Sequence, residues 1–547
     1  MLAELRLNTT GPIVDLGYAR YEGVHNESVE YVTCPQADIM FLKRRPSINT
    51  WFGIRYAQPP TGELRWRAPR DIELNNSYSR TETISASAQG PICVQGTPQW
   101  RVAGNSMTPF RPIGTEDCLL LDVLAPAHPI SSSLPVMVQI HGGGYTQGNS
   151  EYYAGYSLVN QSRGALVYVT IQYRLSAYGF LSSEEIKRSG TANAGLLDQR
   201  AALMWVQRHI SKFGGDPNKV TVYGGSAGGG SVTAQMIMYG GVSSPPFRAA
   251  VAEYPWWQSY SNDSLLELQY SGLLSAANCT SLTCLRSLPE DTLATASQTT
   301  YTNAYVSGLY GYGNFYYGPS VDGDIIRDLP SNEFKQGHFT KVPLLLDRDG
   351  YEGYAFTNKS ENITAEETAD LQTLFPFAQQ SFFSRLYELY PKEAFNSTFF
   401  QRQTWFGDFI INCPTYYMAS ALSDWGLPVW KLIFNAGSQQ HGATHSIIFD
   451  ITYGCKSIIL ITKTSAGQNR TLASITKDWM LSFTTHLDPN AVAYSGVEKP
   501  YWPKYQAAGT SNFSVIDVNY TQIGVVGDFD VSAQCDFWHA MSYIVRN

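Results

Sequence analysis

A serine between small residues is the feature of this chain with the clearest chemical potential. Ser226 lies in the run Gly-Gly-Ser-Ala-Gly at 224–228, after an apolar, β-branched stretch at 220–223 and before a helix-permissive segment at 231–238. A strand that turns sharply into a helix requires residues without large side chains around the serine, because the backbone there is crowded. Such a turn would expose the Ser226 hydroxyl and leave the Ala227 N–H group at a helix N-terminus, where it can bind an anion. The pattern predicts nucleophilic attack on an ester carbonyl.

Glycine-flanked serines also occur in ordinary turns, so neighbouring motifs must decide between the two interpretations. The chain contains 46 glycines, and a match to Gly-x-Ser-x-Gly arises easily by chance in such a composition. A catalytic serine of this kind needs an oxyanion hole and, later in the chain, an acid and a histidine.

A candidate oxyanion hole follows an earlier apolar segment. Residues 135–140 predict a short buried strand, which runs directly into the glycines 142–144 between His141 and Tyr145. Consecutive glycines let backbone N–H groups point into a cavity with no side chain in the way. We therefore expect this loop to supply oxyanion donors rather than to be a flexible connection.

Three carboxylates are candidates for the acid. Residues 341–346 predict another buried strand, and Asp347, Asp349 and Glu352 follow it. A carboxylate after a strand of the central sheet could orient a histidine, and position in the chain does not distinguish among the three.

The candidate bases are the four histidines that follow this region: His441, His445, His486 and His539. Residues 429–434 predict a strand, and the loop 435–440 leads from it to His441. A loop at this position would return over the carboxyl edge of the sheet, which favours His441. His445, four residues later, is the alternative, and packing in an aromatic helix is the expected role of His539.

Several motifs, found in order along nearly the whole chain, resemble the type-B carboxylesterase/lipase family, the cholinesterase-like branch of the α/β-hydrolase fold. They are Trp-Phe-Gly-Ile-Arg-Tyr-Ala-Gln-Pro-Pro at 51–60 with Leu-Arg-Trp at 64–66, Glu-Asp-Cys-Leu-Leu-Leu-Asp-Val at 116–123, and the helix-like segment 193–220 before the serine strand. The resemblance implies a large, mostly parallel mixed sheet flanked by helices, with long insertions that form a gorge or lid. Alternating strand and helix segments favour the same α/β class.

The resemblance also assigns catalytic roles. Glu352 followed by glycine matches the acid of the family, and the segments 434–437 and 441–443 are similar to those that carry its catalytic histidine, here His441. The expected oxyanion donors, by the same resemblance, are the N–H groups of Gly143, Gly144 and Ala227. The expected triad is Ser226, Glu352 and His441.

The chain departs from the family pattern near these residues. The family usually has glutamate before the nucleophile, where this chain has Gly225. The usual Gly-x-Asn before the acid reads Asp347-Arg348-Asp349 here, which adds carboxylates close to the expected acid. Because Gly225 is not a member of the expected triad, we expect activity to survive that change.

Aromatic residues near the expected site are candidates for a substrate pocket, with ordinary packing as the alternative interpretation. Trp256 and Trp257 follow the predicted strand at 249–252, a region that borders the acyl pocket in relatives. The other candidates are Tyr145, after the glycine loop, and Tyr316 and Tyr317, in a tyrosine-rich run.

Eight cysteines indicate an oxidising compartment. The family resemblance implies the disulfides Cys93–Cys118 and Cys279–Cys284 and, by a looser similarity to cholinesterases, Cys413–Cys535, which leaves Cys34 and Cys455 as a fourth pair. A high density of glycosylation sequons points the same way, at Asn8, Asn26, Asn75, Asn160, Asn262, Asn278, Asn358, Asn362, Asn396, Asn469, Asn512 and Asn519. We expect a secreted glycoprotein, most similar to fungal members of the family.

Composition narrows the remaining possibilities. The 547 residues contain no repeat, linker or charge block, which favours one large domain over 1–547. A net charge of −8 disfavours nucleic acid or anionic membrane as a partner, and apolar runs such as 457–462 are too short to span a bilayer. No secretory signal is visible at the first residues, and no metal or cofactor is expected. The sequence does not indicate the oligomeric state.

The predicted function is hydrolysis of a carboxylic ester, with a small to medium or bulky apolar ester as the small-molecule substrate. A catalytically silent binding protein on the same fold is the alternative from a different class, but such relatives typically lose a triad member. A lipase, an amidase or an esterase that acts on toxin side chains would use the same residues, so the sequence leaves these open.

Overall fold

The computed structural model describes residues 8–26, 29–33, 40–44, 47–74, 82–102, 112–360, 363–449, 470–506 and 513–547. The predicted pair Cys34–Cys455 and four of the predicted sequons lie outside the described residues, namely Asn75, Asn362, Asn469 and Asn512. The side chain of Asn8 is also outside the description. Among the other sequons, Asn278 and Asn396 are exposed, whereas five are half-buried: Asn26, Asn160, Asn262, Asn358 and Asn519.

The strands alternate with helices over most of the chain. The strands are β1 (Asn8–Asp15), β2 (Arg20–Asn26), β3 (Val29–Thr33), β4 (Met40–Arg44), β5 (Ile48–Arg55), β6 (Thr83–Ser85), β7 (Leu120–Pro126), β8 (Leu134–Ile140), β9 (Val167–Ile171), β10 (Gly215–Gly225), β11 (Ala249–Glu253), β12 (Leu344–Asp349), β13 (Val429–Asn435), β14 (Ser514–Asn519) and β15 (Ile523–Gly527). The helices are α1 (Tyr156–Gln161), α2 (Ser176–Phe180), α3 (Glu184–Ser189), α4 (Ala194–His209), α5 (Ala227–Ile237), α6 (Asp263–Ala276), α7 (Leu282–Ser287), α8 (Glu290–Val306), α9 (Pro330–Gln336), α10 (Thr364–Leu374), α11 (Gln380–Leu389), α12 (Thr398–Gly407), α13 (Cys413–Asp424), α14 (Ala443–Ile448), α15 (Arg470–His486), α16 (Ala533–Ala540) and α17 (Ser542–Val545).

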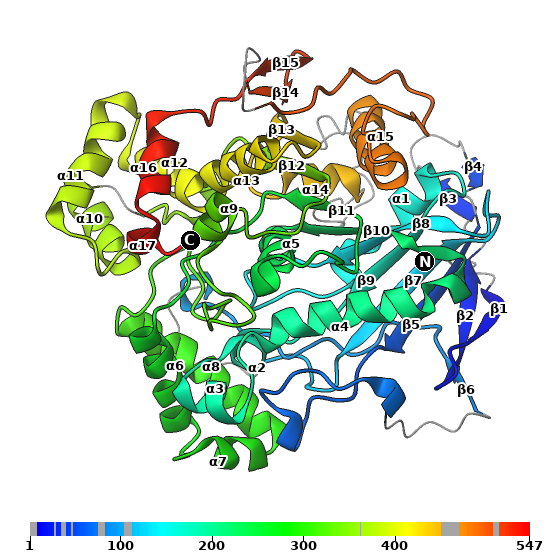
Figure 1. Cartoon of the computed structure of the whole chain (residues 1–547), viewed down its shortest axis with the longest axis horizontal. Coiled ribbons are helices and arrows are strands. Elements are labelled where there is room, and N and C mark those ends of the chain that lie inside the picture. The colour runs from blue at the N-terminus through cyan, green and yellow to red at the C-terminus, as the bar shows by residue number, and fades with distance from the viewer. Residues whose placement is uncertain are drawn as a thin grey trace.

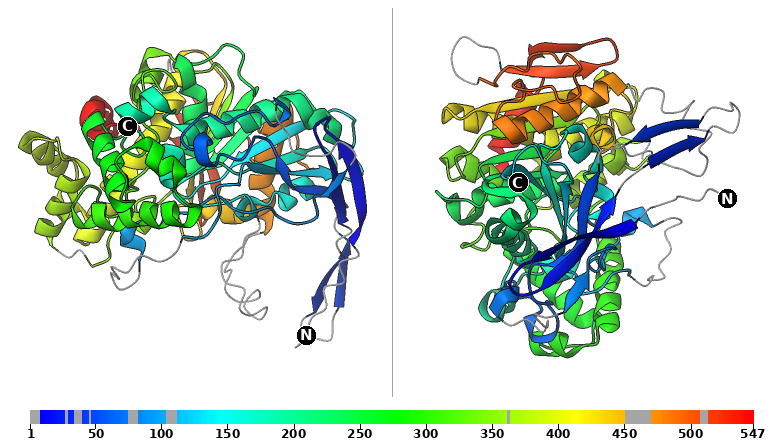
Figure 2. Two further views of the ribbon diagram at one scale, coloured as in Figure 1. Left: turned by 90° about the horizontal axis from the view of Figure 1, so that it is seen from below. Right: turned by 90° about the vertical axis from the view of Figure 1, so that its right-hand side faces the viewer.

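One mixed sheet organises these elements (Figure 1). Its order is β1-β2-β5-β7-β9-β8-β10-β11-β12-β13-β14-β15, and β6 pairs parallel with β2. Strands β3 and β4 form a separate two-stranded sheet. In this spatial order, neighbouring strands from β9 through β8 to β14 are parallel. The neighbours β1-β2-β5-β7-β9 are antiparallel, and so is the last pair, β14–β15. The expected α/β class with a large, mostly parallel core is confirmed. Figure 2 shows β1 and β2 as a long ribbon at one edge, far from α10 and α11.

Alternate residues of the central strands enter two different apolar clusters. In β8, Val136 and Val138 pack in one cluster with Leu203 of α4, whereas Met137 packs in the other with Trp479 of α15. Side chains of a strand point alternately to the two faces of the sheet, so the central strands are apolar on both faces and helices cover both. This burial fixes the register of the strands and, with it, the height at which each strand ends.

The predicted catalytic segments all lie at the carboxyl ends of the parallel strands, on the same side of the sheet. The glycine loop follows β8, Ser226 follows β10, Glu352 follows β12 and His441 follows β13. Because parallel strands place their carboxyl ends together, residues far apart in the chain meet there.

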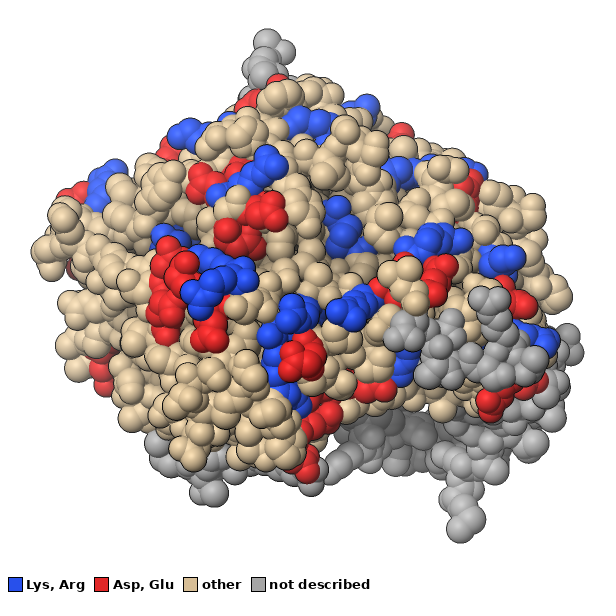
Figure 3. All heavy atoms as spheres, turned by 60° about the horizontal axis from the view of Figure 1, so that its bottom comes forward, with Lys and Arg blue, Asp and Glu red and all other residues tan. Residues whose placement is uncertain are grey.

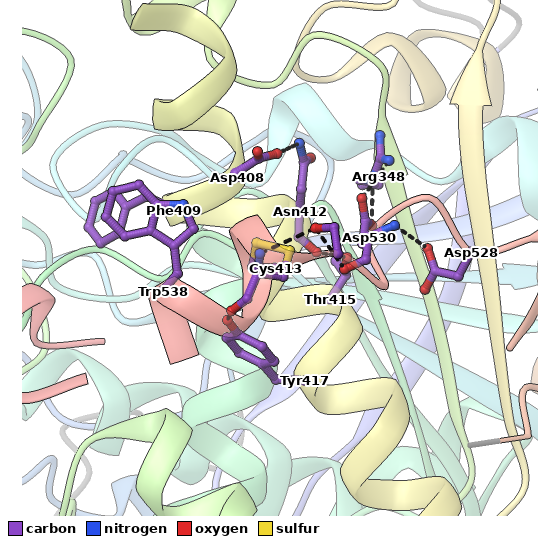
Figure 4. The surroundings of a disulfide bond; sticks show 12 residues. Arg348, Asp408, Phe409, Asn412, Cys413, Thr415, Tyr417, Asp528, Asp530 and Trp538 are labelled. Carbon is purple, nitrogen blue, oxygen red and sulfur yellow. Dashed lines mark hydrogen bonds and ion pairs between the residues drawn. A yellow bond between two sulfur atoms is a disulfide. The ribbon is translucent and has the colours of Figure 1, made fainter. Parts of the chain in front are cut away.

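Three disulfides lie within the described residues: Cys93–Cys118, Cys279–Cys284 and Cys413–Cys535. These are the three pairs that the family resemblance implies. Figure 4 shows how the last one joins α13 to α16, beside a hydrogen bond from the Tyr417 hydroxyl to the carbonyl oxygen of Cys535.

A buried group of ion pairs lies close to this disulfide and joins the C-terminal segment to the sheet. Arg348 of β12 donates from Nε and Nη2 to Asp530, at 2.8 and 2.7 Å. Lys431 of β13 donates to Asp528 at 2.7 Å and to Asp530 at 2.6 Å. Charges that are buried in this way are tolerated when they are paired and hydrogen-bonded, as they are here (Figure 4).

The molecular surface carries both signs of charge. On the face in Figure 3, basic and acidic side chains are intermixed, and neither sign covers a broad continuous area. That face therefore lacks the basic stripe on which nucleic acids are bound. In the part of the chain that the structure describes, no helix combines the length and the apolar composition that a bilayer crossing requires.

Candidate active site

Ser226 occupies a strained turn between β10 and α5. Its backbone has φ 59° and ψ −127°, a conformation that costs a non-glycine residue on the order of 1–3 kcal/mol. The adjacent glycines allow the turn, since a Cβ on Gly224 would lie 2.4 Å from the carbonyl carbon of Gly228. A Cβ on Gly228 would lie 2.1 Å from the carbonyl oxygen of Ile140 in β8. Close approach of three backbone segments is therefore the reason for the small residues around the serine.

His441 connects the serine to a carboxylate. Its Nε2 lies 2.8 Å from the Oγ of Ser226, and its Nδ1 lies 2.6 Å from the Oε2 of Glu352. With the proton assigned to Nδ1, the imidazole donates to Glu352 and accepts from the serine hydroxyl. This arrangement can remove the serine proton and balance the charge that the imidazole then gains.

Burial controls the protonation of this pair. Burial, and next to it the positive charge of Arg101, lowers the pKa of His441 to about 3, so the imidazole is neutral at neutral pH, as a general base requires. Burial raises the pKa of the Glu352 carboxyl, while the N–H group of Asp349 and the guanidinium of Arg348 oppose that rise.

The structure separates the three carboxylates that position in the chain left open. Glu352 faces His441, and its Oε1 accepts a hydrogen bond of 2.6 Å from the N–H group of Asp349. Asp349 instead accepts from the N–H groups of Gly442 and Ala443, at 2.7 and 3.0 Å. Asp347 accepts from the N–H group of Tyr254 at 3.0 Å. Of the three carboxylates, only Glu352 contacts the imidazole of His441.

The glycine loop lies against the serine with two residues at positive φ. Gly143 has φ 110° and Gly144 has φ 65°, and a Cβ on Gly142 would lie 3.0 Å from the Cβ of Ser226. Within the described residues, the N–H groups of Gly143, Gly144 and Ala227 have no hydrogen-bond acceptor. Unpaired N–H groups beside a serine hydroxyl are the geometry that binds an oxyanion.

Tyr254 fills the space next to Gly225. Its hydroxyl lies 2.5 Å from the position that a Cβ on Gly225 would occupy, and its ring centroid lies 4.9 Å from that of His441. The glycine that replaces the usual glutamate of the family thus accompanies a tyrosine packed into the same place. Sequence reasoning missed Tyr254, because its side-chain direction depends on a positive φ of 30° at the end of β11.

Two of the other candidate histidines, His445 and His539, are packed against aromatic rings. His445 packs against Tyr153 and Phe449, with ring centroids 4.4 and 4.5 Å apart, and burial lowers its pKa to about 3. His539 packs against Tyr417 at 4.1 Å, in agreement with the packing role expected for it.

Comparison with known proteins identifies the family of this chain. The family model described as "Carboxylesterase family" matches residues 38–538. The chain belongs to the carboxylesterase family. Enzymes of this family are serine hydrolases that act on carboxylic esters, and the similarity inferred from the sequence motifs is confirmed.

Among similar proteins, this carboxylesterase is 30% identical to Secreted lipase 1 of Botryotinia fuckeliana over 522 residues, which cover 84% of each chain. It is 28% identical to Carboxylesterase patB of Aspergillus clavatus over 97% of this chain and 96% of that one. The crystal structure of Aspergillus niger EstA superposes with a TM-score of 0.81 at 27% identity, over 98% of this chain and 99% of the other. The α/β-hydrolase fold is therefore confirmed.

One of the five predicted pocket residues of this carboxylesterase lies beside the histidine. The ring of Trp256 is 6.1 Å from His441, 5.4 Å from Phe315 and 4.6 Å from Phe356, measured between centroids. Phe356 itself lies 5.0 Å from His441. These rings form an apolar surface next to the imidazole.

The other four predicted pocket residues have internal contacts. Trp257 stacks on Phe334 and donates to Thr233, and the ring of Tyr145 packs on Phe180. Tyr316 and Tyr317 pack against each other at 4.9 Å and against Tyr301. For these four, the packing interpretation describes the observed contacts.

Phe315 and Phe356 are the pocket residues that sequence reasoning did not select. The Cζ atom of Phe315 lies 2.2 Å from the position of a Cβ on Gly144, so its ring covers the oxyanion loop directly. Phe315 stands next to Tyr316 in the aromatic run, and that run was the available signal. Phe356 lies four residues after Glu352, in a short 3₁₀ helix, with no signal of its own in the sequence.

Proposed function

We propose that this carboxylesterase hydrolyses its ester through a Ser226–His441–Glu352 triad and an acyl-enzyme. The observation that supports this most strongly is the double hydrogen bonding of His441, to the serine hydroxyl at 2.8 Å and to the Glu352 carboxylate at 2.6 Å. A serine, a histidine and a carboxylate in this relation form the constellation of nucleophilic acyl transfer.

In the first step, the Oγ of Ser226 forms a bond to the ester carbonyl carbon, and the electron pair of the C=O bond moves to oxygen. His441 Nε2 takes the serine proton, and the Glu352 carboxylate stabilises the imidazolium. The N–H groups of Gly143, Gly144 and Ala227 bind the oxyanion, and losing one such donor costs roughly a hundred- to a thousandfold in rate.

The tetrahedral intermediate then collapses. The bond to the alcohol oxygen breaks, the alcohol leaves with the proton held by His441, and the acyl group remains on Ser226. Water attacks this acyl-enzyme while the imidazole again takes a proton, and the same N–H groups bind the second oxyanion. Release of the carboxylic acid regenerates the serine hydroxyl.

The surroundings of His441 favour an apolar group on the ester. The rings of Trp256 and Phe356 lie beside the imidazole, and the ring of Phe315 packs against them and covers Gly144; all three are buried. Aromatic surface of this kind binds apolar parts of a ligand through the hydrophobic effect. The similar proteins include a secreted lipase and a carboxylesterase, so simple esters and acylglycerols are both candidates.

A series of p-nitrophenyl esters of increasing acyl length tests the proposal, with the purified wild type and the Ser226→Ala variant as blank. We expect hydrolysis by the wild type, with an optimum in acyl length, and none above background by Ser226→Ala. Wild-type turnover no faster than the blank for every ester would favour the silent binding protein. Cleavage of a matched anilide at a comparable rate would favour the amidase.

We also propose that the protein is secreted. Similar proteins named as secreted lipases come from Botryotinia fuckeliana and Gibberella zeae, and the three disulfides suit an oxidising compartment. Expression in a fungal host behind an added secretion signal tests this. The chain should then accumulate in the medium and lose mass on treatment with an N-glycosidase, whereas retention inside the cells without glycans would contradict the proposal.

A further inference from the structure

A positively charged side chain stands on the aromatic surface beside the oxyanion loop. Arg101 ends the short 3₁₀ helix Gln99–Arg101, and its Cζ lies 5.0 Å from the ring centroid of Trp100 and 5.7 Å from that of Phe315. Phe315 covers Gly144, as described above, so the guanidinium lies one aromatic ring away from an oxyanion donor. Stacking on two rings fixes a cation without neutralising it.

The partner of this guanidinium is neutral. Its Nη1 donates to the Oε1 of Gln147 at 3.0 Å, and Gln147 in turn donates to Thr97. Among the described residues, no carboxylate lies within ion-pair distance of Arg101. Its side chain reaches solvent, although the surrounding atoms desolvate the guanidinium enough to lower its pKa. The guanidinium therefore keeps donor groups that are available to a ligand.

Arg402 provides an internal comparison. Its Cζ also lies over two aromatic rings, 4.2 Å from Phe406 and 4.8 Å from Trp405. Unlike Arg101, however, it is buried, and it forms an ion pair with Asp370 at 2.6 Å. The same type of aromatic platform thus carries a neutralised cation at a structural position and an unneutralised one next to the glycine loop.

The charge of Arg101 acts on the site. Its field contributes to the lowered pKa of His441, which means that the guanidinium and the imidazole are close enough to interact electrostatically. Because Phe315 contacts both the guanidinium and the Gly144 position, a negative group of a substrate held at Arg101 would lie one aromatic ring away from the oxyanion loop. The protein as a whole carries a net charge of −8, so an anionic substrate needs a local cation of this kind.

We propose that Arg101 binds a carboxylate of the substrate, so that this enzyme selects esters whose acyl or alcohol part carries a negative charge. The inference rests on the proposed function and narrows the substrates from carboxylic esters in general to half-esters of dicarboxylic acids and related anionic esters. The planar fork of arginine matches a carboxylate, and a charge-assisted pair at a partly desolvated position favours the bound anion about tenfold or more.

The test compares esters that differ only in the terminal group. Monomethyl succinate, glutarate and adipate are matched with methyl butyrate, valerate and hexanoate, and kcat/KM is measured for each pair by titration of released acid. In the wild type, the ratio of the anionic to the neutral ester should depend on chain length and fall with added sodium chloride. In Arg101→Gln, this ratio should fall about tenfold at the preferred length, and Arg101→Lys should retain part of it.

Two controls separate the possible causes. Arg188→Gln removes the same charge from an exposed position on α3 and should leave the ratio unchanged. Binding of monomethyl glutarate to the Ser226→Ala variant, monitored by tryptophan fluorescence, measures recognition without turnover. The double variant Ser226→Ala, Arg101→Gln should bind this ester about tenfold more weakly.

The outcomes also distinguish this inference from the proposed function. Suppose that the wild type hydrolyses the neutral esters and that Arg101→Gln changes the anionic-to-neutral ratio of kcat/KM by less than twofold at every chain length. That result would overturn the role of Arg101 and leave the proposed function standing. Failure of the wild type to hydrolyse any ester would overturn the proposed function. In that case, binding of monomethyl glutarate that does not depend on Arg101 would overturn the inference as well.

Discussion

The hydroxyl of Tyr254 lies 2.5 Å from the position that a Cβ on Gly225 would occupy. Both residues are next to the serine turn, and the tyrosine ring also contacts His441. The tyrosine hydroxyl therefore occupies the space that a side chain at position 225 would need.

This contact predicts coupling between the two positions. Gly225→Ala should destabilise the protein and lower kcat, since the new methyl group meets the hydroxyl and ring edge of Tyr254. Gly225→Ala combined with Tyr254→Ala should cost less than the sum of the single changes, by about 1 kcal/mol or more in free energy of unfolding. Denaturant titration of the four proteins measures this, and strictly additive effects would contradict the arrangement.

The two neighbouring histidines should behave differently on substitution. His441→Ala removes the imidazole that is hydrogen-bonded to Ser226 and should lower kcat by a factor on the order of ten thousand or more. His445→Ala opens a small cavity between Tyr153 and Phe449 and should lower stability while most turnover remains. Steady-state kinetics on one p-nitrophenyl ester decides the matter, and the reverse ranking would refute the assignment of the base.

Asp349 should act as a positioning residue for His441. Its carboxylate accepts from the N–H groups of Gly442 and Ala443, which follow the histidine directly. Asp349→Ala leaves these buried donors unpaired and should lower kcat roughly a hundredfold with little change in KM, because the imidazole loses its exact placement.

The amide variant supplies the control for that prediction. Asp349→Asn retains one acceptor oxygen and should recover a large part of kcat. If Asp349→Ala changed thermal stability but left kcat at the wild-type value, the side chain would serve the fold and not the placement of the histidine.

The pH dependence of stability should reveal a protonated carboxyl beneath the site. Burial raises the pKa of Glu253 to about 8, and its Oε1 is buried without a partner among the described residues. The unfolded chain has an ordinary carboxyl pKa of about 4.3, so between these values the folded state binds more protons. The protonated carboxyl therefore makes its full contribution to the free energy of unfolding below the pKa that it has in the unfolded chain. This contribution is lost as the pH rises through the pKa that it has in the folded protein.

Glu253→Gln tests this sign. From pH 6 to pH 7, Glu253 should reduce the wild-type free energy of unfolding by about 1.4 kcal/mol. The loss should be smaller from pH 7 to pH 8, as the carboxyl ionises in the folded state, and the variant should lack both contributions. Urea titrations at pH 6, 7 and 8 measure the two slopes. Equal slopes would mean that Glu253 is ionised throughout this range.

The fold was predictable from the sequence where a pattern is local. The apolar runs at 135–140 and 429–434 coincide closely with β8 and β13, because burial on both faces of a parallel sheet selects continuous apolar segments. The glycine loop and the serine turn were likewise visible, since both depend on residues without side chains. That residues 1–547 form one domain stays a prediction.

The pocket was less predictable. Trp256 and Trp257 are adjacent and identical in type, yet one faces His441 and the other packs on Phe334. A difference of one residue reverses the direction of a side chain in an extended segment, and only packing fixes which of the two points inward.

The sequence by itself determined the fold class and the chemical types of the reacting groups, because glycine spacing and apolar runs are consequences of local backbone geometry. Position along the chain did not decide which carboxylate meets the imidazole. The family resemblance implied Glu352, and only the tertiary structure brings that side chain into contact with His441. Asp347, Asp349 and Glu352 lie within six residues of one another, and Glu352 reaches His441 because the chain turns after β12 and β13 delivers the histidine from a segment 89 residues away. Such a pairing depends on the register of two neighbouring strands, which no local pattern records.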